Sequence, residues 1–486
     1  MSTNKDFIVA IELGSSKVTG IAGRKNLDGS ISVLAVCQEE SSSFIRNGVV
    51  YKMDKTAQCI SSIVNRLQTQ LETRIVRVYV GMGGQSIHSE RNVIVRDLSQ
   101  LDMITNEMVD DIQETNRRMH YPGQFILDSI TQEYKVDTLQ QIDPVGIQCR
   151  HLESNFLNIL CREQFYNNIN ECFNVARVQI ADLLLSPIAL AESVLSYTEK
   201  RSGCVLVDIG ADTTTVAVYH KNILRHLAVI PLGGINITRD IASQHIEENV
   251  AEMLKKKYGT AYSDFVETSD AVQYNAGDDK TISNVLFNDI VESRLREIIE
   301  NVQNQIPKHY RDNLLGGIIL TGGGSNIRDI EKAFVTFTGI QKVRVAKYVM
   351  LTVNSHLEEA TAHNAMMNTA LAILAKGDIS CSGDDYKPNQ QLFDPEGEAA
   401  VDVNGPVVIE VTNPQPRREG VVISAAEREA LERKRAEEEA RKAEEEAEAQ
   451  RKAEEEARIA EEEKSEEPRP SAMGRFMKWL RNMTEE

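Results

Sequence analysis

The sequence predicts an α/β fold that is built from two similar halves, and three observations lead to this fold class. Strand-like apolar runs alternate with amphipathic stretches from residue 1 to about residue 380, which is the pattern of α/β proteins. A strand, an acidic residue, a glycine and hydroxyl residues follow one another near residue 12 and again near residue 208. The length of 486 residues exceeds what one hydrophobic core supports, so we expect about two to four folded units.

Composition and charge limit the possible functions. The net charge is −19, and segment 425–467 contributes 18 Glu against 10 Lys and Arg, a net of −8. The rest of the chain therefore still carries −11. Nonspecific binding of nucleic acid needs clustered Lys and Arg, so the acidic body predicts that nucleic acid is not a partner.

The cysteines and the N-terminal residues predict a cytoplasmic protein. The seven cysteines are odd in number and none forms a Cys-x-x-Cys pair, which is typical of reduced thiols in a cytosol. The first residues lead directly into the strand-like run Phe7–Ile11 without an apolar signal region. No stretch approaches the roughly 20 apolar residues that a membrane-spanning helix needs. We therefore expect neither export nor a transmembrane helix.

The first segment with a chemical pattern is Val9–Val18, in which a strand leads to Glu12 and then to a glycine and hydroxyl residues. A tight turn of this kind presents backbone N–H groups to phosphate, while the carboxylate stays close enough to hold a hydrated Mg²⁺ ion. An ordinary hairpin turn after a strand has the same sequence pattern. The candidate phosphate-binding residues here are Gly14, Ser15, Ser16 and Lys17.

Residues Cys204–Thr215 repeat this order about two hundred residues later, with Asp208 as the acid and Gly210 as the glycine. A duplicated fold needs two such hairpins, one from each half, to hold phosphates and magnesium from both sides. The repetition therefore indicates a nucleotide site in which Glu12 and Asp208 bind magnesium through water. The other candidate residues of this hairpin are Asp212, Thr213 and Thr214.

A third segment, Leu315–Ser325, is a strand that opens into three consecutive glycines. Three positions without side chains let the backbone lie flat against a nucleotide base and sugar. A glycine loop by itself can also be a turn between a strand and a helix, but its place after the second acidic hairpin favours nucleotide binding. The candidate residues are Gly322, Gly323, Gly324 and Ser325.

The order of acidic hairpin, acidic hairpin and glycine loop resembles that of the actin-like ATPase superfamily. The chain is similar to the bacterial FtsA family of cell-division proteins in this superfamily over residues 5 to 380. The matching segments outside the three loops are Gln132–Asp137, Pro144–Ile147, Leu183–Ser193 and Leu224–Pro231. The resemblance implies an actin-like (ribonuclease H-like) duplicated fold in two lobes that binds ATP and Mg²⁺.

The resemblance also implies four subdomains, a linker and a terminal helix. In chain order these are 1–85 with 166–195 as 1A, 86–165 as the family's 1C (SHS2-like) insertion, 196–230 with 315–380 as 2A, 231–314 as 2B, 381–470 as the linker and 471–484 as the helix. The polar sequence between Gln85 and Gln124 agrees with an exposed insertion.

Two regions of the expected 2B subdomain resemble contact sites of the family. Residues Ala251–Gly259 are similar to an adenosine-contacting helix, so Glu252 and Lys255 are candidate contacts, although an amphipathic helix with solvated lysines has the same pattern. In the family, the C-terminal peptide of the tubulin-like protein FtsZ docks on 2B. Arg294 could pair with such an acidic peptide or could be a solvated helix arginine.

The second hairpin departs from the family at Ala211 and Asp212, which stand where glycines are common. A requirement for φ > 0 at either position would now cost about 1 kcal/mol or more, and Asp212 adds negative charge beside the phosphates. No residue stands out as the group that activates water, so the catalytic residue is unknown. We therefore expect ATP binding with weak or no hydrolysis.

The predicted linker, 381–470, is turn-rich at its start and then strongly charged. Its segment 425–467 consists almost wholly of Glu, Ala, Arg and Lys, which favour helix. Because only Leu431 and Ile459 are apolar residues larger than Ala, no coiled-coil seam forms. A solvated helix of up to about 64 Å and a disordered chain both fit this composition, and either would act as a spacer.

Residues 471–484 predict an amphipathic helix that lies on a membrane. At about 100° per residue, apolar side chains share one face, a tryptophan lies at its edge and basic side chains lie opposite. These residues are Met473, Phe476, Met477, Leu480 and Met483, then Trp479, then Arg475, Lys478 and Arg481. A basic face with an interfacial Trp is typical of helices on anionic membranes. Docking on the core or in a partner's groove is the alternative, but FtsA-like proteins end in a similar tail.

Together these features predict a cell-division adaptor. Such a protein would bind ATP, assemble with itself into filaments, and contact anionic lipids and other division proteins. It would hold the FtsZ ring at the cytoplasmic face of the inner membrane. A kinase of the same fold that acts on a small metabolite is the alternative, but no acid poised as its base stands out. A heat-shock-like chaperone would need a β domain where the charged spacer stands.

Overall fold

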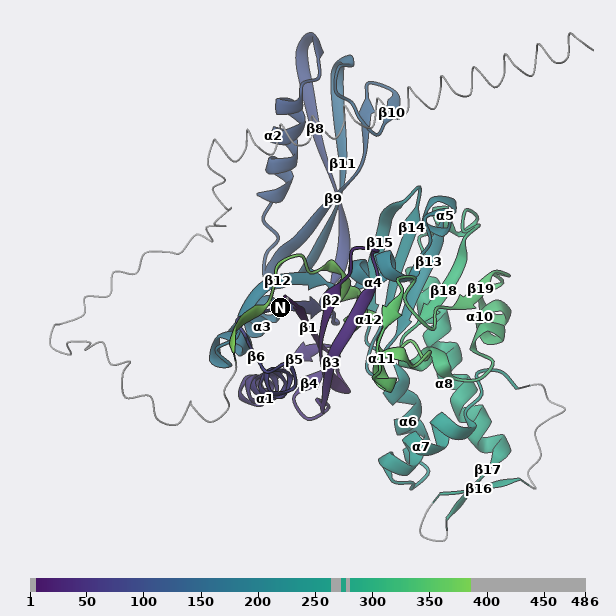
Figure 1. The fold of residues 1–486 in the computed structure, drawn as a ribbon. Helices are drawn as coiled ribbons and strands as arrows, with labels where there is room; N and C mark the ends of the chain where they lie inside the picture. Colours follow the sequence, from purple (N-terminus) through teal and green to yellow (C-terminus); the bar gives the residue numbers. More distant parts are fainter. Residues whose placement is uncertain (1–5, 264–271, 277–279, 386–486) are drawn as a thin grey trace, which may run out of the picture. The chain divides into compact units, whose positions relative to one another are not determined.

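The structure is a computed structural model that describes residues 6–263, 272–276 and 280–385. Its first sheet contains six strands in the described residues and begins with the N-terminal hairpin (Figure 1). In spatial order the strands are β12 (Gln179–Leu185), β7 (Arg77–Met82), β1 (Ile8–Leu13), β2 (Lys17–Lys25), β3 (Ile31–Glu40) and β20 (Val353–Asn354). The pairs β12–β7 and β7–β1 are parallel, whereas β1–β2 and β2–β3 are antiparallel.

The second sheet contains nine strands in the described residues. In spatial order they are β10 (Leu139–Gln141), β9 (Gln124–Val136), β11 (Gln148–Arg162), β8 (His88–Met103), β15 (Ile223–Ile230), β14 (Thr214–His220), β13 (Cys204–Ile209), β18 (Gly317–Thr321) and β19 (Val343–Val345). The run β19-β18-β13-β14-β15 has the same parallel and antiparallel pairings as β12-β7-β1-β2-β3. The two halves of the chain therefore share one fold, as the repeated sequence pattern predicts.

Among the described residues, the helices that cover the first sheet are α1 (Met53–Leu71), α3 (Glu163–Val175), α4 (Ser186–Val194) and α12 (Asn368–Lys376). Helices α4 and α12 pack on each other between the two sheets (Figure 1). Helix α12 also packs on β1, β2 and β7, where a Cβ atom at Gly81 would collide with Ile373. The sequence prediction assigned 315–380 to 2A, but by these contacts α12 lies on the first sheet.

The opposite face of the second sheet is covered by α6 (Gly234–Ala242), α7 (Glu248–Tyr258), α8 (Asn284–Gln305) and α10 (Ile330–Thr338). The sequence of α8 explains its burial, because Phe287, Val291, Leu295 and Ile298 recur at helical spacing and are buried. Ser283 begins this helix by accepting the Leu286 N–H. Shorter elements of this half include β16 (Gln273–Asn275), β17 (Thr281–Ser283), α9 (Lys308–Arg311) and the 3₁₀ helix η1 (Gly323–Asn326), whereas α11 (Glu358–Thr361) contacts β3 and β20 of the first sheet.

The strands β8, β9 and β11 form an insertion with a core of its own under α2 (Asn106–Arg117) (Figure 1). Thr105 caps α2, and Ile112 of this helix is buried in the same cluster as Phe156 of β11. Its strand β8 joins the second sheet through the pair His88 and Ala228. The insertion agrees with the one that the resemblance implies for residues 86–165.

The described chain ends beside its beginning. Strand β21 (Ser382–Asp385) pairs with β6 (Thr73–Ile75), and the Cys381 N–H donates to the Phe7 carbonyl at 2.8 Å. The folded body thus reaches Asp385, a few residues into the predicted linker. The rest of that linker and the predicted membrane helix 471–484 lie outside the described residues.

The seven cysteines are all buried and unpaired. Burial raises the pKa of Cys59, Cys161 and Cys204 to about 12, so these side chains stay protonated thiols. No helix of the described chain is both long enough and apolar enough to cross a bilayer.

An ion pair between Glu199 and Arg344 joins α5 (Tyr197–Ser202) to β19. Arg344 donates from Nε and Nη2 to the two carboxylate oxygens at 2.7 and 2.9 Å, and Ser196 donates to the same carboxylate. Burial by itself would raise the pKa of Glu199, but the bonds from Arg344 and Ser196 outweigh it and lower this pKa to about 2. The ion pair therefore contributes fully to stability at pH values above 4.5, the ordinary pKa of a glutamate. This contribution is lost as the pH falls toward about 2, the pKa of Glu199 in the folded protein.

We expect Glu199→Gln to lower the free energy of unfolding at neutral pH by about 1.5 to 3 kcal/mol. The difference from wild type should shrink as the pH falls below about 4.5, because the wild-type carboxylate then loses its advantage. Urea unfolding followed by circular dichroism measures both effects. Glu300→Gln is the control, since it removes an exposed pair with Arg296 and should cost less than about 1 kcal/mol. Equal stability of Glu199→Gln and wild type at neutral pH would refute this assignment.

Candidate functional site

The acidic residues of the two hairpins occupy equivalent positions in the two sheets. Glu12 on β1 is in register with Gly81 of the parallel strand β7, and Asp208 on β13 is in register with Thr321 of the parallel strand β18. Each acid stands one residue before the end of its strand. Ligands of parallel α/β sheets bind beyond such strand ends, so the fold places both carboxylates where a bound phosphate or metal is expected.

Both carboxyl groups have raised pKa values, and the charge of Asp208 acts on Glu12 across the two halves. Burial is the largest cause, the negative charge of Asp208 adds to it and Lys17 opposes it, and together they raise the pKa of Glu12 to about 7. Burial raises the pKa of Asp208 to about 6. Two neighbouring carboxylates with raised pKa values are stabilised in their ionised form by a divalent cation. The pair therefore fits a hydrated Mg²⁺ ion, as the sequence predicts.

Lys17 lies beside this pair at the start of β2. Its Nζ donates to Gln38 Oε1 at 3.0 Å. Burial lowers the pKa of Lys17, the charge of Glu12 raises it, and Lys256 of α7 and Glu359 of α11 have smaller opposite effects. Lys256 is thus a cation of the second half that acts on the first hairpin, and it is not among the residues predicted from the sequence.

Lys255, which the sequence predicts as a nucleotide contact, is buried, and its ammonium group already has three hydrogen-bond partners. Its Nζ donates to the Gly234 carbonyl at 2.9 Å, to Thr238 Oγ1 at 2.9 Å and to Glu252 Oε2 at 2.5 Å. Glu252 also accepts from Thr238 and pairs with Lys256 at 3.2 Å. Lys255 therefore ties α7 to the start of α6, whereas Lys256 and Lys257 of the same helix are exposed.

The predicted glycine loop packs directly on the second hairpin. Gly322 has φ +83°, and a Cβ atom there would collide with Asp208 Oδ1. A Cβ atom at Gly324 would collide with the side chain of Ile209. The buried Ser325 hydroxyl donates to the Gly322 carbonyl at 2.7 Å, so this residue shapes the loop. Glycine is required here for close approach, and the loop lies within contact of the acid that would hold the metal.

A second pair of glycines, Gly233 and Gly234, lies on the other side of the same hairpin. The Gly234 N–H donates to the Gly210 carbonyl at 3.0 Å, and a Cβ atom at Gly233 would collide with the Ala211 carbonyl. These residues were missed in the sequence analysis. The sequence does contain a pattern that could have identified them, because this glycine pair follows a strand and precedes a helix, as the three-glycine loop does.

The two departures from the family pattern do not strain the backbone. Neither Ala211 nor Asp212 is among the described residues with positive φ, so the conformational cost considered from the sequence does not arise. Asp212 Oδ2 instead accepts the backbone N–H of Asn47 at 2.9 Å. The extra negative charge beside the expected phosphates remains.

The predicted hydroxyl residues divide into two groups. Ser15 Oγ accepts the Gly48 N–H at 2.8 Å, and the buried Thr214 hydroxyl donates to the Leu232 carbonyl at 2.8 Å. Ser16 is exposed and Thr213 is half-buried at the turns of their hairpins. A Cβ atom at Gly14 would lie 2.6 Å from the Lys17 carbonyl, which explains the glycine in the first turn. Ser16 and Thr213 are therefore the hydroxyls best placed for an added ligand.

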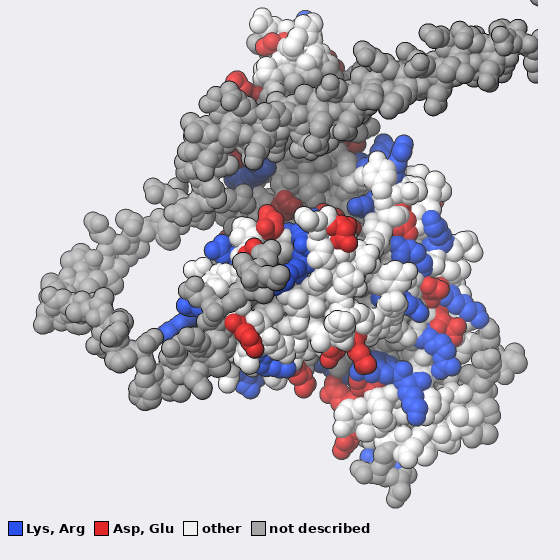
Figure 2. Space-filling view, in the orientation of Figure 1, with Lys and Arg blue, Asp and Glu red and all other residues white. Residues whose placement is uncertain are grey.

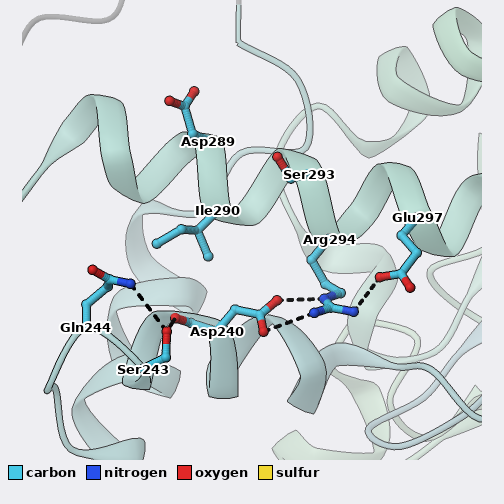
Figure 3. A pocket seen from close by; sticks show the side chains of 8 residues that line it. All are labelled: Asp240, Ser243, Gln244, Asp289, Ile290, Ser293, Arg294 and Glu297. Carbon is cyan, nitrogen blue, oxygen red and sulfur yellow. Dashed lines mark hydrogen bonds and ion pairs between the residues drawn. The ribbon is translucent and has the colours of Figure 1, made fainter.

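Arg294 lies in a separate pocket of about 410 Å³ between α6 and α8. Its guanidinium binds Asp240 through Nε at 2.6 Å and Nη2 at 3.0 Å, and also pairs with Glu297 (Figure 3). The other lining residues are Ser243, Gln244, Asp289, Ile290 and Ser293. With three carboxylates against one guanidinium, the pocket carries surplus negative charge, and Arg294 is already paired.

The comparisons with known proteins agree with this architecture. A family model described as "Cell division protein FtsA" matches residues 205–372, and one described as "SHS2 domain inserted in FTSA" matches residues 84–160. The cell division protein FtsA of Porphyromonas gingivalis is 30% identical over 347 residues, which cover 70% of this chain and 72% of that protein. The chain belongs to the FtsA family.

Other relatives and a solved structure extend this result. FtsA of Neisseria meningitidis is 29% identical over 68% of this chain and 81% of its own length, and FtsA of Bacillus subtilis is 29% identical over 66% and 74%. A solved chain from the "PilM-PilN type IV pilus biogenesis complex" has a TM-score of 0.52 at 16% identity and covers 76% of this chain and 97% of its own. The FtsA-family fold is thus actin-like, with the SHS2 insertion formed by β8, β9, β11 and α2.

Proposed function

We propose that this FtsA-family protein binds ATP with Mg²⁺ between its two halves, assembles with itself, and holds FtsZ filaments at the cytoplasmic face of the inner membrane at the division site. The observation that carries the proposal is the equivalent placement of Glu12 and Asp208, each one residue before the end of its strand in one half of the duplicated fold. A nucleotide bound by both hairpins would connect the two halves of the molecule. Self-assembly would then depend on nucleotide binding.

The residues have distinct roles in nucleotide binding. Glu12 and Asp208 hold the water shell of Mg²⁺, which neutralises phosphate charge. Backbone N–H groups of the turns at Gly14–Ser16 and Ala211–Thr213 would receive the phosphates, and Gly322–Gly324 would approach the base and sugar, whereas the Gly210 N–H already donates to the Thr213 carbonyl at 2.8 Å. Lys17 and Lys256 supply positive charge from the two halves. Since Asp212 adds negative charge beside the phosphates, we expect weak or no hydrolysis.

The membrane role rests on the sequence of residues 471–484. A helix of about three turns, with five apolar residues and three basic ones, binds an anionic surface only marginally when it acts alone. Self-assembly presents many such helices on one surface, and the resulting avidity makes attachment firm. Assembly and membrane binding are therefore two parts of one mechanism.

The pocket between α6 and α8 is the proposed docking site of the FtsZ C-terminal peptide. Ile290 offers apolar contact, and the surplus of carboxylates would favour a basic side chain of the peptide. An acidic side chain that pairs with Arg294 would have to compete with Asp240 and Glu297. On the face shown in Figure 2, acidic and basic side chains of the described residues are interspersed. Because the described part of this face has no large patch of one charge, we expect the FtsZ peptide to be recognised by a local pocket of this kind.

We expect Ser293→Tyr to weaken binding of the FtsZ peptide by at least about tenfold, equivalent to about 1.4 kcal/mol. The reason is that the ring would fill the pocket that Ser293 lines. Fluorescence anisotropy of a labelled peptide, titrated with the full chain, measures the affinity. Glu300→Tyr is the matched control, because Glu300 is exposed on the same helix outside the pocket. Unchanged affinity of Ser293→Tyr would place the docking site elsewhere.

A further inference from the structure

A tight turn between β4 (Ile45–Arg46) and β5 (Val49–Val50) contacts both nucleotide hairpins. Its two central residues, Asn47 and Gly48, have φ of 52° and 71°. An Asn-Gly pair adopts such positive φ values readily, which is why it forms two-residue hairpin turns. In this conformation the N–H groups of both residues point away from the hairpin and are available to other partners.

Those two N–H groups bind one side chain from each half of the protein. The Asn47 N–H donates to Asp212 Oδ2 at 2.9 Å, and the Gly48 N–H donates to Ser15 Oγ at 2.8 Å. Asp212 lies in the turn of the second hairpin, and Ser15 lies in the turn of the first. A single turn therefore fixes the two phosphate-binding turns relative to each other.

The same turn packs against residues 83–85, which lead into the insertion. The Gln85 N–H donates to the Asn47 carbonyl at 2.9 Å, and Asn47 Nδ2 donates to Gln85 Oε1 at 3.1 Å. A Cβ atom at Gly48 would lie 2.6 Å from both the Gly83 carbonyl oxygen and Gly84 Cα. Because backbone packs on backbone here, the turn cannot shift without moving residues 83–85.

Strand β8 of the insertion begins directly after this segment. The Ile87 N–H donates to the Gly84 carbonyl at 3.0 Å, and His88 is the residue that pairs with Ala228 of the second sheet. The next residue, Ser89, accepts the Leu227 N–H on its hydroxyl at 2.8 Å. The base of the insertion is thus connected to the turn by a short, hydrogen-bonded path.

We propose that Asp212 is a positioning residue that links the second phosphate hairpin, through the turn at Asn47 and Gly48, to the base of the insertion. The functional meaning of this link rests on the proposed nucleotide binding. A nucleotide that shifts the two hairpin turns would shift the turn at Asn47 and Gly48, and with it residues 83–89. Because the bond is made by the side chain of Asp212, a residue without a side-chain acceptor at this position would not make it. Asp212 therefore gives this chain a contact between its proposed nucleotide site and its insertion.

Hydrogen exchange of the full-length protein, with and without ATP and Mg²⁺, tests the link in two segments, 45–50 and 84–89. Asp212→Ala removes the acceptor, so we expect both segments to exchange about tenfold faster or more without nucleotide, as loss of a bond to a charged group predicts. Asp212→Asn keeps an oxygen acceptor and should restore slow exchange. Asp312→Ala, which removes an exposed carboxylate from the end of α9, is the control.

Nucleotide should slow exchange at the first hairpin, residues 14–17, in all variants. It should change exchange at 84–89 in wild type and in Asp212→Asn but not in Asp212→Ala. If Asp212→Ala leaves 84–89 as in wild type, or if its nucleotide response there persists, the link is refuted. If nucleotide does not change exchange at residues 14–17 of the wild type, the proposed nucleotide binding fails, while the comparison of wild type with Asp212→Ala in the absence of nucleotide still tests the link.

Discussion

Asp208→Ala is expected to weaken ATP binding by about 10- to 100-fold, the usual cost of removing a group that orients the water shell of a bound metal. Asp208 is coupled to Glu12 across the two halves, so its loss leaves Mg²⁺ held from one side only. Equilibrium titration of the purified full chain with a fluorescent ATP analogue and Mg²⁺ measures the affinity. Asp312→Ala serves as the control for a carboxylate lost elsewhere on the surface.

The same variant should not destabilise the protein in the absence of nucleotide. Burial raises the pKa of Asp208 to about 6, so its ionised form is less stable in the folded state than in water. Removing it relieves that cost at neutral pH, and it also relieves the repulsion of Glu12. A melting temperature equal to or above that of wild type, together with lost affinity, would separate binding from folding. Equal ATP affinity of Asp208→Ala and wild type would refute the site.

A chain that ends at Pro470 is expected to lose flotation with anionic liposomes, which the full chain should show. Within the tail, Leu480→Glu should reduce binding by at least about tenfold, because burying a leucine contributes about 1.5 to 3 kcal/mol and the new charge is repelled by anionic lipid. Trp479 is the single tryptophan of the chain, so a blue shift of its emission on adding liposomes reports insertion directly.

Asn482→Glu is the matched control, since it makes the same charge change on the polar side of the predicted helix. Its effect should be clearly smaller than that of Leu480→Glu. Equal losses in the two variants would indicate attraction by charge alone rather than insertion of an apolar face. Flotation of the chain that ends at Pro470 would contradict a role for the tail.

The duplicated fold could be predicted because its pattern is local. Each half contains a strand, an acid, a glycine and hydroxyl residues within about a dozen positions, and the structure places Glu12 and Asp208 at matching registers. The packing of α12 on the first sheet could not be predicted. An amphipathic pattern shows that a helix buries one face, but it does not identify the sheet that covers that face.

The site was predicted less completely, and α7 shows why. Ala251, Leu254 and Lys255 share its buried face, so helical periodicity could have shown that Lys255 points inward and that Lys256 remains exposed. The bond between Asn47 and Asp212 could not have been found in this way. It joins residues 165 positions apart and depends on the arrangement of both halves in the folded protein.

Flotation of FtsZ filaments with anionic liposomes, in the presence of this protein, ATP and Mg²⁺, tests the proposed adaptor most directly. We predict that filaments float with the full chain and stay in solution with the chain that ends at Pro470. Ser293→Tyr should itself float but leave the filaments behind, because its tail is intact and its pocket is filled. Filaments that float equally well with the shortened chain, or that fail to float although the full chain does, would contradict the account.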